Sequence, residues 1–131
     1  MTSVRFTMTT LVVPDYDAAI AFFVGGLGFD LVEDSDLGEG KRWVVVGGAD
    51  GGRLLLAKAT TPEQSAAIGN QTGGRVGFFV HTDDFAGTHG RLVDAGATFE
   101  EQPRHDRYGT VAVFSDPFGN RWDLIEPKEP A

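Results

Sequence analysis

Short runs of apolar and β-branched residues, separated by clusters of glycine, proline and aspartate, follow one another along most of the chain. Runs of this length between turn-forming residues are typical of β-strands. In one segment of the first half, apolar residues recur at three-to-four-residue spacing, as they do on one face of a helix. These residues are Ala19, Ile20, Phe22, Phe23 and Leu27. The first half therefore predicts a strand at 5–13, this helix, and strands at 29–33, 42–46 and 53–58.

The ends of these elements carry recognisable signals. Asp15 or Asp17 can cap the first helix, and the glycines after it end it. Residues 36–40 read as a turn, and the glycine-rich segment 47–52 reads as a hairpin.

The second half repeats the order of the first. It predicts a strand at 75–81, a helix that starts at Asp83-Asp84 and ends before Gly96, and three further strands. Those strands span 98–103, 110–115 and 121–126, and 116–120 reads as a tight turn before the last of them. A supersecondary unit that recurs in the same order is stronger evidence than any single strand assignment. We therefore expect one domain over 1–131, with repeat units at about 4–59 and 75–127, a linker at 60–74 and a short helix in that linker.

Two β-α-β-β-β units predict an α+β fold. One face of each sheet takes the helix, and the other needs a partner, which the second unit supplies. We expect the units to form a cupped mixed sheet with the helices on its outer face. Strand alternation places Gly77, Phe79 and His81 on the concave side.

The paired units, Val13-Pro14-Asp15 before the first helix, Leu27-Gly28-Phe29, and above all the segment 116–124, Asp-Pro-Phe-Gly-Asn-Arg-Trp-Asp-Leu, resemble the vicinal oxygen chelate superfamily. The resemblance spans about residues 5–126. That superfamily includes glyoxalases, extradiol dioxygenases and metal-free antibiotic-binding proteins, so the fold alone does not give the function.

The resemblance also implies where a metal would bind. The four positions that carry ligands in metal-using members correspond here to Met8, Leu55, Gly77 and Asp123. Only Asp123 offers a ligand for a hard divalent metal. We therefore expect no metal and no other cofactor.

Polar and aromatic residues near the predicted concave face are the candidates for function. Asp123 interrupts an apolar strand, and a carboxylate on a partly dry sheet needs a partner or shifts its pKa. It could pair with Arg121, or act as a general acid or base with His81 or Tyr108. The expected ligand-binding residues are Arg42, Trp43, Gln71, Arg75, Phe79 and Arg121.

Composition limits the kinds of molecule that the protein can be expected to bind. The formal net charge of −8 argues against nucleic acid and anionic membranes. There is no cysteine, which excludes disulfides and thiolate chemistry. The start has no apolar signal region, so we expect a cytoplasmic protein. We also expect a homodimer, the commonest oligomer.

Three functions remain open. The first is a metal-independent lyase or isomerase that acts on a small organic metabolite, with arginines holding an anionic group. The second is sequestration of an antibiotic or metabolite without catalysis. The third is a divalent-metal lyase or dioxygenase with a different ligand set.

Overall fold

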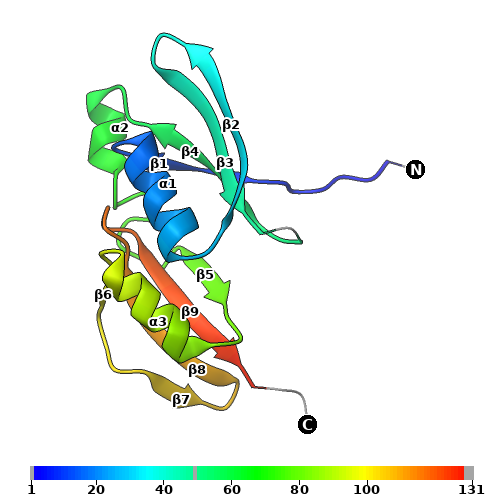
Figure 1. Ribbon diagram of the computed structural model, residues 1–131, viewed down its shortest axis with the longest axis vertical. Helices are drawn as coiled ribbons and strands as arrows, with labels where there is room; N and C mark the ends of the chain where they lie inside the picture. Colours follow the sequence, from blue (N-terminus) through cyan, green and yellow to red (C-terminus); the bar gives the residue numbers. More distant parts are fainter. Residues whose placement is uncertain (1, 49, 129–131) are drawn as a thin grey trace. The chain divides into compact units, whose positions relative to one another are not determined.

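The computed structural model describes residues 2–48 and 50–128, and it confirms the α+β class. Ala49, within the expected hairpin at 47–52, lies outside the described residues. The chain divides into two compact units, Met1–Ser65 and Ala66–Ala131. Each unit contains one sheet and one main helix, in the predicted β-α-β-β-β order, with one extra short strand in the second unit (Figure 1).

The sheet of the first unit has the order β1-β4-β3-β2. Its strands are β1 (Thr9–Val13), β2 (Asp30–Gly38), β3 (Lys41–Gly47) and β4 (Arg53–Lys58). β1 runs parallel to β4, and the other neighbours are antiparallel. Alternate residues of β1, β3 and β4 are fully buried, and these are Leu11, Val13, Val44, Val46 and Leu56.

The first helix begins where the sequence predicted, and the structure selects Asp15 as its cap. The Asp15 carboxylate accepts a hydrogen bond from Ala18 N at 2.8 Å. Helix α1 (Tyr16–Ile20) continues into the π-helical segment η1 (Ala21–Gly26), in which Leu27 N donates to Phe22 O. The wider π turn leaves the adjacent rings Phe22 and Phe23 both buried, at 5.2 Å between centroids.

Two strand boundaries in this unit differ from the prediction. β1 starts at Thr9 instead of Arg5, because its partner β4 begins at Arg53 and offers nothing to pair with residues further upstream. Strand β2 extends through Asp36, where a turn was expected, because Asp36 still pairs with Arg42. The turn falls instead at Glu39-Gly40, where positive φ angles reverse the chain.

The second unit repeats the topology with the order β5-β9-β8-β6. Its elements are β5 (Phe78–His81), α3 (Phe85–Asp94), β6 (Thr98–Phe99), β7 (Arg104–Asp106), β8 (Gly109–Ser115) and β9 (Arg121–Pro127). β5 is parallel to β9, as β1 is to β4. The Asp84 side chain caps α3 by accepting from Gly87 N.

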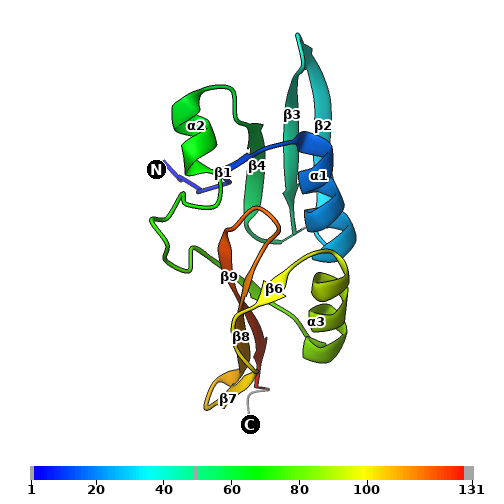
Figure 2. The same ribbon diagram turned by 90° about the vertical axis from the view of Figure 1, so that its left-hand side faces the viewer.

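Helix α3 lies against one face of this sheet (Figure 2). An aromatic series marks that face: His89 of α3 stacks on Phe99 with 3.8 Å between centroids. Phe114 and Trp122 continue the series, and both are buried. This stacking leaves His89 half-buried on the helix.

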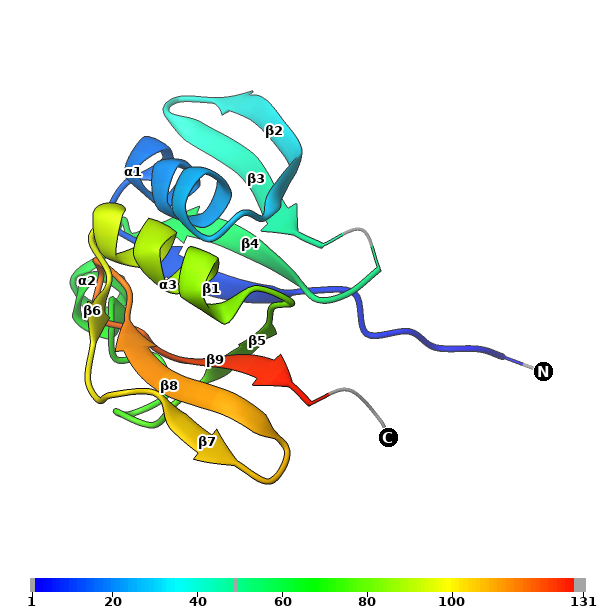
Figure 3. The ribbon, with the colours of Figure 1, turned by 60° about the horizontal axis from the view of Figure 1, so that its bottom comes forward.

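The expected strand 98–103 is two elements. β6 and β7 pair with different ends of β8, as Figure 3 shows for β7. Between them the side chain of Glu101 accepts the backbone hydrogen bond of Val113 N, and Pro103 has no N–H to give. The Glu101 carboxylate thus replaces a backbone carbonyl as the hydrogen-bond partner of β8 at this point, and the strand is interrupted there.

Asp116 organises the turn before β9. Its buried carboxylate accepts hydrogen bonds from Phe118 N, Asn120 N, Asn120 Nδ2 and Trp122 Nε1, at 2.9–3.0 Å. Gly69 packs so closely on this turn that a Cβ there would clash with Phe118 O. The family-like segment 116–122 therefore fixes where β9 starts, and with it which face Asp123 occupies.

Helix α2 (Pro62–Ala67) lies within the predicted linker, and the boundary between the units falls inside it. Within residues 2–48 and 50–128, no helix has the length and apolar character needed to cross a membrane.

Candidate functional site

The candidate site lies on the face of the second sheet that is opposite α3. Asp123 is at the middle of this face, because its neighbours Trp122 and Leu124 point into the helix side and are buried. Its cross-strand neighbours are apolar: Phe79 on β5 and Val113 on β8. Phe79 is 63% exposed, an unusual state for a large aromatic side chain.

One oxygen of Asp123 is buried without a hydrogen-bond partner. Among the described residues, Oδ1 of Asp123 is the buried side-chain oxygen or nitrogen for which the protein supplies no bond, although the residue as a whole is partly exposed. Burial raises the pKa of Asp123 above its ordinary value. Arg104 and Arg121 act in the opposite direction, and Glu101 adds to the increase. Asp123 is thus a carboxyl group with one buried oxygen that receives no hydrogen bond from the described residues.

The sequence suggested that Arg121 could pair with Asp123, but Arg121 binds another carboxylate. It makes a two-pronged bond to Glu100, with Nε and Nη2 at 2.9 and 2.7 Å from the carboxylate oxygens. Its remaining nitrogen donates to Gly74 O at 3.0 Å. The pairing lowers the pKa of Glu100 and raises that of Arg121.

Arg104 is the second cation near Asp123, and sequence reasoning missed it. Its guanidinium binds Glu101 and Asp106, each at 2.8 Å. The hydrogen bond from Arg104, together with the one from Val113 N, lowers the pKa of Glu101. The sequence showed acidic and basic residues close together at 100–106, but only β7 pairing shows that they border Asp123.

The loop 70–75 lies beside this face. The methyl group of Thr72 occupies the space where a Cβ on Gly77 would lie. The hydroxyl of Thr72 donates to Arg75 O, and Arg121 holds the carbonyl of Gly74. The side chains of the candidates Gln71 and Arg75 are exposed on this loop.

The other two proposed catalytic residues lie further along the second unit. His81 follows Phe79 by two residues on the same face of β5, pairs with Ile125 and is exposed. Tyr108 lies in the turn between β7 and β8 and is 57% exposed. The hydrogen bond to Glu101 is the main cause of the raised pKa of Arg104, and Tyr108 adds a smaller contribution.

Arg42 and Trp43 belong to the first unit. Arg42 joins helix α1 to the β2–β3 hairpin, because it bonds to Asp17 at 2.8 Å and to Asp34 through two nitrogens. It also lies over the ring of Tyr16, 5.1 Å from the centroid. Trp43 is half-buried on the opposite face of β3 from the core residue Val44.

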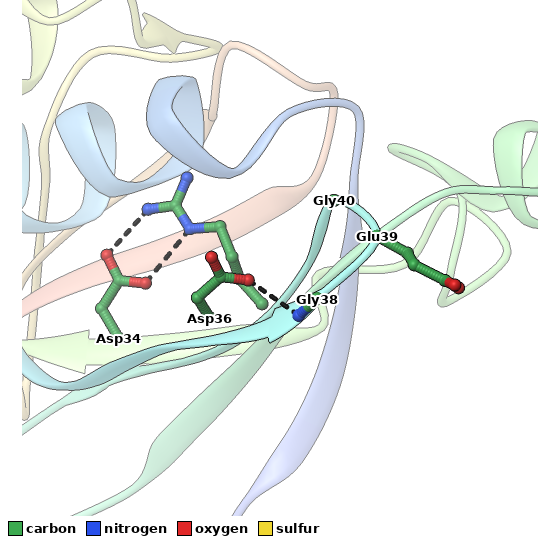
Figure 4. A pocket seen from close by; sticks show the side chains of 6 residues that line it. Asp34, Asp36, Gly38, Glu39 and Gly40 are labelled. Atoms are coloured by element: carbon green, nitrogen blue, oxygen red, sulfur yellow. Dashed lines mark hydrogen bonds and ion pairs between the residues drawn. The ribbon is translucent and has the colours of Figure 1, made fainter.

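An open pocket of about 350 Å³ lies beside Arg42, at the tip of this hairpin. Its lining is Asp34, Asp36, Gly38, Glu39, Gly40 and Arg42. Figure 4 shows Glu39 pointing away from the pocket and Asp36 turned to the backbone of Gly38. Asp34 and Asp17 already engage the guanidinium, and this pairing lowers the pKa of Asp34. The hollow is therefore explained by the turn and its ion pairs.

The residues present do not fit a metal of the kind that the resemblance implies. Leu55 and Gly77 offer no ligand atom, and Met8 offers only a thioether. Gly77 could not be a vacant ligand position either, because Thr72 fills the space of its side chain. Across the described part of the chain, no three His, Asp or Glu side chains gather closely enough to hold a metal ion.

Comparison with known proteins gives a consistent picture. A protein of Shewanella frigidimarina (strain NCIMB 400), described as uncharacterized, is 53% identical over 119 residues, which cover 88% of each chain. The solved structure of UcmS2 is similar with a TM-score of 0.76 and 32% identity, and covers 95% of this chain and 99% of that one. TnmS3, described as an antibiotic binding protein from Streptomyces sp. CB03234, has a TM-score of 0.72 and 28% identity, covering 98% and 99%.

The family model described as glyoxalase/bleomycin resistance protein/dioxygenase superfamily matches residues 5–124. This range contains the strands and helices of both units except the last residues of β9, and it includes the turn that Asp116 holds together. The chain therefore belongs to the glyoxalase/bleomycin resistance protein/dioxygenase superfamily.

Proposed function

We propose that this protein binds and sequesters a small organic molecule at the sheet face around Asp123, without a metal and without converting it. The observation that carries the proposal is the carboxyl group of Asp123, which is partly exposed and has one buried oxygen without a partner, beside the exposed ring of Phe79. A partly buried carboxylate that lacks hydrogen bonds costs stability, and a ligand that donates a hydrogen bond to its accessible side lowers that cost. Small-molecule sites typically combine an apolar surface with a few directed polar groups.

The similarity to TnmS3 supports binding as the function. That protein is described as antibiotic binding, and it matches this chain over almost its whole length. The side chains at Leu55 and Gly77 support independence from metal, since neither can contribute a ligand.

The second candidate is metal-independent acid–base catalysis of the lyase or isomerase type. The raised pKa of Asp123 favours it, because such a carboxyl group can hold and release a proton closer to neutral pH. Catalysis usually needs a second proton-transfer group, and the two candidates, His81 and Tyr108, are exposed. Sequestration needs only the acceptor and the ring.

The test is a thermal-shift screen of aromatic microbial antibiotics against the protein, followed by mass spectrometry of each bound compound after release. We expect at least one compound that stabilises the protein, is recovered unchanged, and loses most of its effect in Phe79→Ala and Asp123→Asn. Asp94→Asn is the matched control, since Asp94 is exposed on α3, against the other face of the sheet. Recovery of a chemically altered compound would favour catalysis instead.

Analytical ultracentrifugation of the same samples tests the expected homodimer.

A further inference from the structure

The ring of Phe79 indicates the shape of the ligand. Phe79 is 63% exposed, and it pairs across the sheet with Asp123 in register. On the other side of Asp123 lies Val113, also apolar. A flat apolar surface with one acceptor at its centre suits an aromatic ring that covers Phe79 and Val113 and carries a polar group above Asp123.

Asp123 indicates the polarity of that group. When it is ionised, the partly exposed carboxylate of Asp123 accepts hydrogen bonds and donates none, so the group above it must be an N–H or O–H donor. A carbonyl, carboxylate or phosphate in that position would place one acceptor against another.

The two nearby arginines do not offer an anion site. Arg121 is engaged by Glu100 and by Gly74 O, and Arg104 is engaged by Glu101 and Asp106. The face and its rim therefore hold four carboxylates, at 100, 101, 106 and 123, against three guanidinium groups, at 104, 121 and, on the neighbouring loop, 75. An anionic ligand beside Arg104 or Arg121 would have to displace an existing ion pair, and anywhere on this face it would approach an excess of negative charge.

We propose that the ligand is an aromatic molecule, neutral or cationic, that stacks on Phe79 and donates an N–H or O–H hydrogen bond to Asp123. This inference rests on the binding function proposed above. It departs from the expectation that the arginines hold an anionic group.

Three naphthalene compounds with the same ring test it. They are 2-naphthylmethylamine, which is a cation with N–H donors at neutral pH, 2-naphthol, which is neutral with one O–H donor, and 2-naphthoate, which is an anion without a donor. Each is titrated into ¹⁵N-labelled full-length protein, and the amide shifts of β5 and β9 are followed by NMR. We expect the amine and the naphthol to shift these strands, and the naphthoate to bind at least tenfold more weakly.

Variants separate the contributions. Asp123→Asn is expected to weaken the amine about tenfold, as loss of one charge-assisted hydrogen bond does. Asp94→Asn, which removes an equal charge from α3, is expected to leave the affinity unchanged. Naphthoate that binds β5 and β9 as tightly as the amine does, or an amine that is indifferent to Asp123→Asn, would overturn the inference while leaving a binding site. If none of the three compounds shifts β5 or β9, the proposed site itself is wrong.

Discussion

Replacing Asp123 with asparagine is expected to make the protein more stable at neutral pH. Most substitutions at half-buried polar positions do the reverse, so the sign is informative. The carboxylate pays for burial without a hydrogen bond to Oδ1, whereas asparagine keeps its size and loses the charge. A buried unsatisfied group costs about 1–3 kcal/mol. Because Asp123 is partly exposed and the amide is still polar, we expect a gain of about 1 kcal/mol at pH 7.

The pH dependence of this gain has a defined sign. The folded-state pKa of Asp123 is raised above the unfolded value, so folding favours the protonated form. The cost is therefore fully present above the raised folded pKa and disappears as the pH falls below about 3.9, the ordinary value for aspartate. The neighbouring groups Glu101, Arg104 and Arg121 are present in both proteins, so their own titration largely cancels in the difference.

Urea unfolding at several pH values between 3 and 7 measures the difference directly. We expect a variant that is more stable at pH 7 and indistinguishable from wild type near pH 3. Glu101→Gln is the matched control of opposite sign. Arg104 and Val113 N lower the pKa of Glu101 in the folded protein, so the Glu101 carboxylate stabilises the fold at pH 7 and loses this effect in acid. The Gln variant is therefore expected to be less stable than wild type at pH 7. An Asp123→Asn protein that is less stable than wild type at pH 7 would show that the carboxylate has a favourable partner, and would refute the reasoning.

Three other substitutions test the framework around the site. The buried carboxylate of Asp116 accepts four hydrogen bonds, and Asp116→Asn would turn an amide nitrogen toward some of their donors. We expect this variant to lower the free energy of unfolding in urea by about 2–4 kcal/mol, and a loss under about 0.5 kcal/mol would contradict the role of Asp116 in the turn. Gly77→Ala should lower stability by about 1–3 kcal/mol because its Cβ meets the methyl group of Thr72, and the second substitution Thr72→Ala should recover most of the loss; additive losses would show that the two sites are independent. Arg42→Ala should speed amide hydrogen exchange at the tip of the β2–β3 hairpin with less than about 1 kcal/mol of global destabilisation, since the ion pairs are near the surface; unchanged exchange there would mean that the ion pairs do not hold the hairpin.

Much of the fold could be predicted from local patterns. The caps Asp15 and Asp84, strand β4 and the turn at 116–120 depend on residues that are close in sequence. Strand ends were less accurate, because a strand ends where its partner ends. β1 is shorter than predicted for this reason, and the expected strand 98–103 is divided because the Glu101 side chain replaces the backbone as the partner of Val113 N.

The sequence by itself determined that Asp123 stands on a strand, that its neighbours point the other way, and that Leu55 and Gly77 cannot ligate a metal. These conclusions follow from the two-residue period of a strand and from the chemistry of single side chains. Only the tertiary structure decided the partners. Arg121 binds Glu100, 21 positions away, and Oδ1 of Asp123 receives no hydrogen bond from the part of the chain that the structure describes, while Thr72 fills the space over Gly77. Partner choice depends on strand register and loop path, which bring together groups that no local pattern connects.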